Sequence, residues 1–215
     1  MTILALEFSS SQRSAAVSHH GSRAEAIEAG GHGTNAFSLI EKVLAEAGLE
    51  REQIEVIAVG LGPGSYTGIR VALSIAQGWQ LARGVKLLGI SSAECLAAQA
   101  QAGKIFGRVN VVIDAQRNEF YRAAYEISPT GWGEIRPLQI SALSAISPNA
   151  AANGIWIGPE ATRWFPKGKI VFPTAMTLGR LAGRRSDFAS GDKLAPIYLR
   201  ETNFVKAPPP NSVAF

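Results

Sequence analysis

The stretch GLGPGSYTG, residues 60–68, follows an apolar run that predicts a strand and precedes an alanine-rich run that predicts a helix. A glycine-rich turn in this position forms either a phosphate cradle or a tight corner. It lacks the Gly-Lys-Ser/Thr ending of a P-loop, because Ile69 and Arg70 follow its last glycine, and it misses the G-x-G-x-x-G spacing of dinucleotide folds. We therefore favour a structural corner, with Gly64 kept as a candidate nucleotide contact.

Strands and helices alternate around this stretch. Apolar runs predict strands over 2–6, 14–18, 54–59 and 85–90, and helical periodicity is found over 35–47, 69–83 and 92–100. Thr34 is the expected N-cap of the first helix, and Gly48 and Gly84 are expected to end the first two helices. This alternation predicts an α/β fold with a mainly parallel or mixed sheet.

A pattern of apolar strand, acid, polar turn and second strand occurs twice. Glu7 ends the first copy of the leading strand and Asp114 ends the second, and an offset of 107 residues superposes these acids and also places Ala16 on Ala123. Two copies in 215 residues indicate a duplicated α/β unit. In a duplicated nucleotide-binding fold the two acids would face a cleft between lobes. The alternative is that each acid anchors its polar turn.

The composition predicts a cytoplasmic globular protein. The chain is 47% hydrophobic, yet no window approaches the roughly 18 uncharged apolar residues of a membrane span, and residues 1–11 lack signal-peptide features. The single cysteine, Cys95, allows no internal disulfide. From Glu160 onward, nine Lys and Arg stand against four acids. This basic part would attract an anion such as RNA, or form only a solvated face.

Few side chains are placed for catalysis. No two histidines have metal-ligating spacing, and His32 alone, in a glycine-rich loop, is kept as a functional candidate. Ser65 does not fit the G-x-S-x-G elbow of a serine nucleophile. The helix predicted over 69–83 is apolar all round, with small residues between bulky ones. Such a helix must be covered on every side, by its own fold or by a second chain.

The opening stretch and three others resemble one bacterial family. GLGPGSYTGIRVALSIAQGWQLA is similar to the signature of the TsaB family, the dimerisation subunit of the machinery that makes threonylcarbamoyladenosine in tRNA, as are ILALEFSSSQRSAAVS, VVIDAQRNEFYRAAYE and APIYLRE. The similarity is loose over residues 139–193. It implies a two-lobed, duplicated fold of the actin, hexokinase and Hsp70 type, which is ribonuclease H-like. We expect an N-terminal lobe over 1–104, a C-terminal lobe over 105–205 and a disordered tail over 206–215.

The resemblance also implies a subunit without catalysis of its own. The paralogous catalytic family, TsaD, carries a metal-binding H-x-x-x-H where this chain has Ser92-Ala-Glu-Cys-Leu96. We therefore expect no catalytic residue and no metal here, and ATP only at a subunit junction of a complex. Relatives commonly have aspartate at the position of Glu7, which weakens any carry-over of nucleotide contacts to this residue. Glu7, Asp114 and Gly64 are kept only as candidate nucleotide contacts. The alternative is an ATP-dependent phosphotransferase or a peptidase of the glycoprotease type.

The partners implied by the resemblance are proteins and, through them, tRNA. A TsaD-type catalytic subunit would bind this chain, a TsaE-type ATPase would join the larger complex, and the isolated chain would form a homodimer. In the family, helices of the N-terminal lobe make the contact, which correspond here to 35–47 and 69–83. The residues expected at this interface are Phe37, Ile40, Leu44, Ile69, Ala72, Leu73, Ala76 and Trp79.

Overall fold

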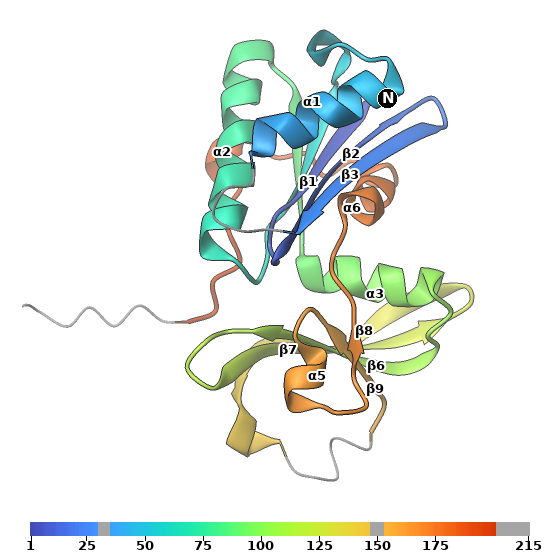
Figure 1. The fold of residues 1–215 in the computed structure, drawn as a ribbon, viewed down its shortest axis with the longest axis vertical. Coiled ribbons are helices and arrows are strands. Elements are labelled where there is room, and N and C mark those ends of the chain that lie inside the picture. Colours follow the sequence, from blue (N-terminus) through green and yellow to red (C-terminus); the bar gives the residue numbers. More distant parts are fainter. Residues whose placement is uncertain (30–34, 147–152, 201–215) are drawn as a thin grey trace, which may run out of the picture.

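The computed structural model describes residues 1–29, 35–146 and 153–200, which form two α/β lobes (Figure 1). The expectations for Thr34, His32 and the tail 206–215 concern residues outside these ranges. Within them, no helix is both long enough and apolar enough to cross a membrane.

The first sheet has five strands in the order β3-β2-β1-β4-β5. They are β1 (Ile3–Glu7), β2 (Gln12–His19), β3 (Ser22–Ala29), β4 (Val56–Gly60) and β5 (Lys86–Ile90). Because β1 pairs antiparallel with β2 and parallel with β4, the predicted mixed sheet is confirmed. The sequence does not predict β3, since this largely exposed edge strand has no run of large apolar residues.

The second sheet repeats this order as β10-β9-β6-β7-β8. Its strands are β6 (Gly107–Asp114), β7 (Glu119–Ser128), β8 (Gly131–Ala142), β9 (Ile155–Gly158) and β10 (Lys169–Ile170). The strands β6 and β7 again pair antiparallel, and β6 and β9 parallel. The predicted duplication is therefore confirmed, and the fold is two-lobed, actin-like α/β. The second turn is one residue shorter, because Glu7 pairs with Ser14 and Asp114 with Phe120.

Helices cover both faces of the first sheet. The long helices are α1 (Ala36–Ala47), α2 (Tyr66–Arg83) and α3 (Ser92–Ala102), the shorter ones are α5 (Ala161–Trp164) and α6 (Ala175–Ala182), and single 3₁₀ turns span Arg51–Gln53, Leu143–Ala145 and Gly191–Lys193. Figure 1 shows α1 and α2 on one face and α6 on the other. The observed N-cap of α1 is Asn35, and the predicted ends at Gly48 and Gly84 are confirmed by their left-handed φ angles.

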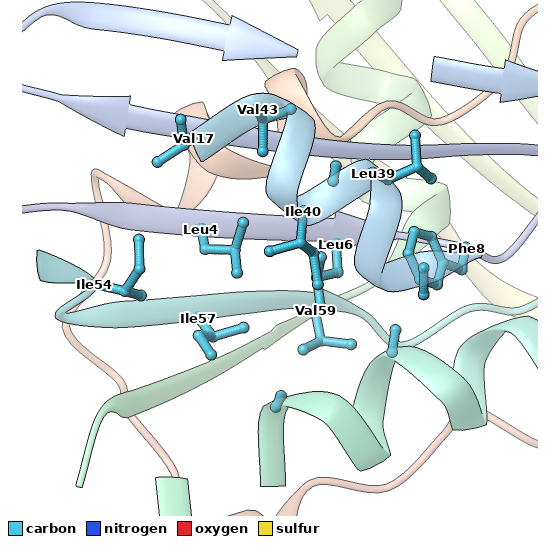
Figure 2. Packing of buried hydrophobic residues seen from close by; sticks show 14 of the residues in the cluster. Leu4, Leu6, Phe8, Val17, Leu39, Ile40, Val43, Ile54, Ile57 and Val59 are labelled. Atoms are coloured by element: carbon cyan, nitrogen blue, oxygen red, sulfur yellow. The ribbon is translucent and has the colours of Figure 1, made fainter. Parts of the chain in front are cut away.

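The core of the first lobe lies between the first sheet and the helices α1 and α2. Alternate residues of β1 and β4, such as Leu4, Leu6 and Val59, point to the same face as Ile40 of α1 (Figure 2). Each of these four side chains is at most 1% exposed. Burying one such side chain contributes about 1.5–3 kcal/mol, so this interface fixes α1 and α2 firmly on the sheet.

The chain after β10 returns to the first sheet, which the sequence does not predict. The helix α6 packs on β1 and β2, and the 3₁₀ turn at 191–193 packs on α2. Residues 196–200 do not form a strand. Instead the Ile197 amide donates to the Leu61 carbonyl at 2.9 Å. The Arg200 guanidinium then reaches the Ala115 carbonyl at 2.9 Å, so this segment ties the two lobes together.

Candidate functional site

The glycine-rich stretch forms a tight corner. The Ser65 amide donates to the Ser9 carbonyl at 2.6 Å, and a Cβ on Gly64 would lie only 2.0 Å from that oxygen. A Cβ on Gly68 would lie equally close to the Phe8 carbonyl oxygen. The Ser65 hydroxyl caps the helix by accepting from the Gly68 amide at 3.2 Å. The glycines therefore allow the corner to pack directly against the turn between β1 and β2.

Glu7 lies inside the first lobe and is fully buried. Its carboxylate accepts hydrogen bonds from the Ser9 amide at 2.8 Å and the Ser92 hydroxyl at 3.0 Å. A Cβ at Gly60 would lie 2.1 Å from one carboxylate oxygen, so that glycine makes the space. Burial raises the pKa of Glu7, and the two serine contacts oppose the rise. This geometry is that of an acid anchoring a turn.

Asp114 occupies a different environment at the edge of the second lobe. It accepts from the Gln116 amide at 2.7 Å and forms an ion pair with Arg163 at 3.0 Å. Glu160 lies beside it and accepts from the Asp114 amide at 3.3 Å. Burial raises the pKa of Glu160. Asp114 lines the cleft between the two lobes, and Glu7 does not. The structure thus does not bring the two strand-end acids to one cleft.

A cleft of about 1740 Å³ opens between the lobes. The turn after β1, the corner with Gly64, the exposed side of α2 and the turn after β6 form its walls. Its charged side chains are mainly cationic, because the arginines Arg13, Arg70, Arg117 and Arg200 outnumber the acids Asp114 and Glu160. The charge and size of the cleft suit an anionic group.

Two tyrosines from distant parts of the chain meet at this cleft. The rings of Tyr66 and Tyr198 stack with 5.4 Å between their centroids, and the Arg70 guanidinium lies 4.0 Å from the centroid of Tyr66. Such a cation over an aromatic face contributes about 0.5–1 kcal/mol when exposed. Sequence reasoning did not find this cluster, because Tyr66 and Tyr198 are brought together only by the return of the chain along α2.

Residues 92–96, which stand where TsaD proteins carry their metal motif, serve packing in this chain. Ser92 is buried and donates to Glu7, Leu96 is fully buried, and Glu94 pairs with Arg185 at 2.6 Å. Cys95 is buried too, and its burial raises the pKa of the thiol. Among the residues that the structure describes, no three His, Cys, Asp or Glu side chains are grouped as a metal site.

Most of the expected interface residues lie in the core of the chain itself. Six of the eight are buried: Ile40, Leu44, Ile69, Ala72, Leu73 and Ala76. Because the small residues of α2 pack against the sheet, they let that helix approach its own strands, not a partner. The expected interface therefore needs correction. Phe37 remains, with 53% of its surface exposed, and Trp79 is half-buried.

The opposite side of α2 is open to solvent. Along it lie Tyr66, Arg70, Ser74, Gly78 and Leu81, spaced by three or four residues and all exposed. Leu81 is 89% exposed, and Val71 and Ile75 beside this row are only partly buried. We call these seven residues the outer face of α2. On this face, apolar surface remains exposed to solvent in the described part of the chain.

Comparison with known proteins gives the family. A family model described as TsaD, tRNA N6-adenosine threonylcarbamoyltransferase, matches residues 25–200. A relative in Haemophilus influenzae, named tRNA threonylcarbamoyladenosine biosynthesis protein TsaB, is 36% identical over 126 residues, which cover 56% of this chain and 52% of the relative. The protein of the same name in Escherichia coli is 27% identical over 188 residues, covering 79% of this chain and 80% of the relative.

Two solved structures have the same fold over nearly their whole length. YeaZ from Pseudomonas aeruginosa has a TM-score of 0.80 and 26% identity, covering 92% of this chain and 99% of its own. A second crystal structure from that organism, described as similar to the peptidase YeaZ, has a TM-score of 0.79 and 27% identity, covering 93% of this chain and 99% of its own. The chain belongs to the TsaD family that the model describes and, within it, to the TsaB members.

Proposed function

We propose that this chain is a non-catalytic scaffold that binds a TsaD-type catalytic subunit and supports threonylcarbamoyladenosine modification of tRNA. The names of its relatives support a role in that biosynthesis. The observation that carries the scaffold role is the outer face of α2. Exposed apolar side chains on a helix that its own sheet holds rigidly are typical of a protein interface.

The other groups that catalysis would use support the same proposal. Glu7 is locked beneath the corner by Ser9 and Ser92. Asp114 is paired with an arginine at the surface. Neither carboxylate is held free at the end of its strand, where a water or phosphate could be activated.

The interface is best tested on residues that do not serve the core. Glutamate at Ala72 or Ala76 would disrupt packing and would not isolate partner binding. Gly78 suits the purpose, because a Cβ there meets nothing within 4 Å. Arginine at this position also has the higher helix propensity, by about 0.8–1 kcal/mol.

The experiment is co-elution of the purified chain with a TsaD-type subunit, followed by an assay of tRNA modification. We expect Gly78→Arg to weaken binding at least tenfold, or about 1.4 kcal/mol, with no loss of thermal stability. Ala102→Arg, at an exposed position on the last turn of α3, is the matched control. If Gly78→Arg still co-elutes and supports modification as well as the control does, the outer face of α2 is not the interface.

The remaining partners belong to the same proposal. In the larger complex a TsaE-type ATPase would join, tRNA would be bound through the catalytic subunit, and ATP would bind only at a subunit junction. The isolated chain would pair with a second copy through the same outer face, in the cytoplasm. Mass measurement of wild type and Gly78→Arg tests this, because the variant should be monomeric. Calorimetry with ATP and magnesium tests the phosphotransferase alternative, which requires binding by the isolated chain.

A further inference from the structure

A second, smaller pocket lies on the α6 side of the first sheet. It has a volume of about 230 Å³ and is bounded by β1, by the hairpin of β2 and β3, and by α6. It shares no lining residue with the cleft between the lobes. Since α1 and α2 cover the opposite face of the sheet, the pocket is also separate from the proposed interface (Figure 1).

The charged groups that line this pocket are all cationic. Arg23 comes from β3, and Arg180 and Arg184 come from α6 and the residues that follow it. Ser18 adds a hydroxyl. Glu25 interacts electrostatically with Arg180 but does not line the pocket, and its carboxylate accepts from the Met176 amide at 2.7 Å. Three arginines therefore line one small pocket, and none of its lining residues is an acid.

Arg180 has an unused donor. Its Nε is buried and has no hydrogen-bond partner among the residues that the structure describes, whereas its terminal nitrogen donates to the Thr177 hydroxyl at 3.1 Å. Buried donors are normally paired, and an exception in a native fold needs an explanation. The guanidinium of Arg180 therefore keeps hydrogen-bonding capacity that the described part of the fold does not use.

The size and charge of the pocket restrict the ligand. Gly179 and Gly183 of the α6 region line it and add no side chain to its wall. Its volume is below the roughly 300 Å³ at which pockets for drug-sized ligands begin, so only a small group fits. A phosphate carries more charge than a carboxylate and accepts two parallel bonds from a guanidinium. We infer that this pocket binds a phosphate group, held by Arg180 with Arg23 and Arg184.

The test is a titration with inorganic phosphate at constant ionic strength, read by thermal unfolding of the whole chain. A ligand that binds only the folded state raises Tm, and above its Kd the rise continues with the logarithm of the ligand concentration. We expect this rise in the wild type. Arg180→Gln should weaken the apparent affinity at least about tenfold, because it removes a charge-assisted bidentate contact. Arg51→Gln, which removes an arginine from the exposed pair with Glu41, is the control and should leave the affinity unchanged.

A second variant protects the test against a folding defect in Arg180→Gln. Gly183 has helical backbone angles, and a Cβ there meets neighbours only at 3.5 Å or beyond. Gly183→Leu should therefore fold, fill the pocket and abolish the phosphate effect without touching a charge. An equal rise in Tm in Gly183→Leu and wild type, or no rise in wild type, would overturn the inference.

Two further probes distinguish the sources of the phosphate. A phosphate monoester such as 5′-AMP represents a small metabolite, and a short RNA represents a polynucleotide backbone. If the site serves RNA, the RNA should bind more tightly than free phosphate, with a salt dependence that becomes shallower in Arg180→Gln. If it serves a metabolite, the monoester should bind and the RNA should show no loss in that variant. If Gly183→Leu has no effect on phosphate binding, neither result supports a phosphate site in this pocket.

Discussion

Glu7 and Asp114 end the same strand in the two repeats, yet their surroundings differ. Glu7 is fully buried, and its two acceptor contacts come from its own turn and from α3. Asp114 lies at the cleft edge and pairs with a mostly exposed Arg163. Strand order is the same around both acids. The comparison teaches that a duplication can preserve topology while the electrostatic environment of equivalent residues diverges.

The helices that follow the two inner parallel strands explain much of this difference. After β4 the chain turns at the glycine corner into the 18 residues of α2, whereas after β9 it turns into the four residues of α5. The long helix α2 covers one side of the first sheet and leaves its own outer face exposed. The short helix α5 covers less of the second sheet, so Asp114 stays near solvent.

The largest effect should come from the two corners. Gly64 has φ +145° with the Ser9 carbonyl 2.0 Å from a potential Cβ, and Gly158 has φ +153° with the Val112 carbonyl at 1.8 Å. We expect Gly64→Ala and Gly158→Ala each to cost at least about 3 kcal/mol in denaturant unfolding, since the contact is with backbone in both cases. Gly78→Ala, in open space, should stabilise by up to about 1 kcal/mol. A mild effect at only one corner would show that the corners are not equivalent.

A smaller effect should come from Glu7, and it should depend on pH. The folded-state pKa of Glu7 is raised by burial, so its contribution to stability is complete below the unfolded value and is lost as pH rises through the folded value. The free energy of unfolding of Glu7→Gln relative to wild type should therefore increase as the pH rises above about 4.5, the ordinary pKa of glutamate, by at most about 1.4 kcal/mol per pH unit. If the free energies of unfolding of wild type and Glu7→Gln changed with pH in the same way, that result would contradict the burial of Glu7.

The smallest effect should come from the second acid. Asp114→Asn removes an ion pair in which Arg163 has 62% of its side chain exposed, so it should cost at most about 1 kcal/mol. Raising the salt concentration should shrink the difference further. If Asp114→Asn instead costs clearly more than about 1 kcal/mol at pH 7, the contrast between the repeats is wrong. Chemical denaturation of both variants under identical conditions gives the comparison.

Local patterns in the sequence predicted much of the fold. The glycine corner, the ends of α1 and α2 at Gly48 and Gly84 and the repeat that relates Glu7 to Asp114 all depend on residues close together in the chain. The strands β3 and β8 were missed, since exposed edge strands lack the apolar runs that reveal buried ones. A pattern can show that a helix has apolar sides, but it does not show which side its own sheet covers.

The sequence by itself determined the two α/β repeats, the family and the order of the main elements, because periodicity, caps and turns act over a few residues. Only the tertiary structure decided that Glu7 is buried, that Ala72 and Ala76 face the sheet and that Tyr198 stacks on Tyr66. It also placed Arg180 beside the first sheet, more than 150 residues along the chain from that sheet's first strands. Burial and charge depend on such distant contacts, and these form only when the whole chain packs.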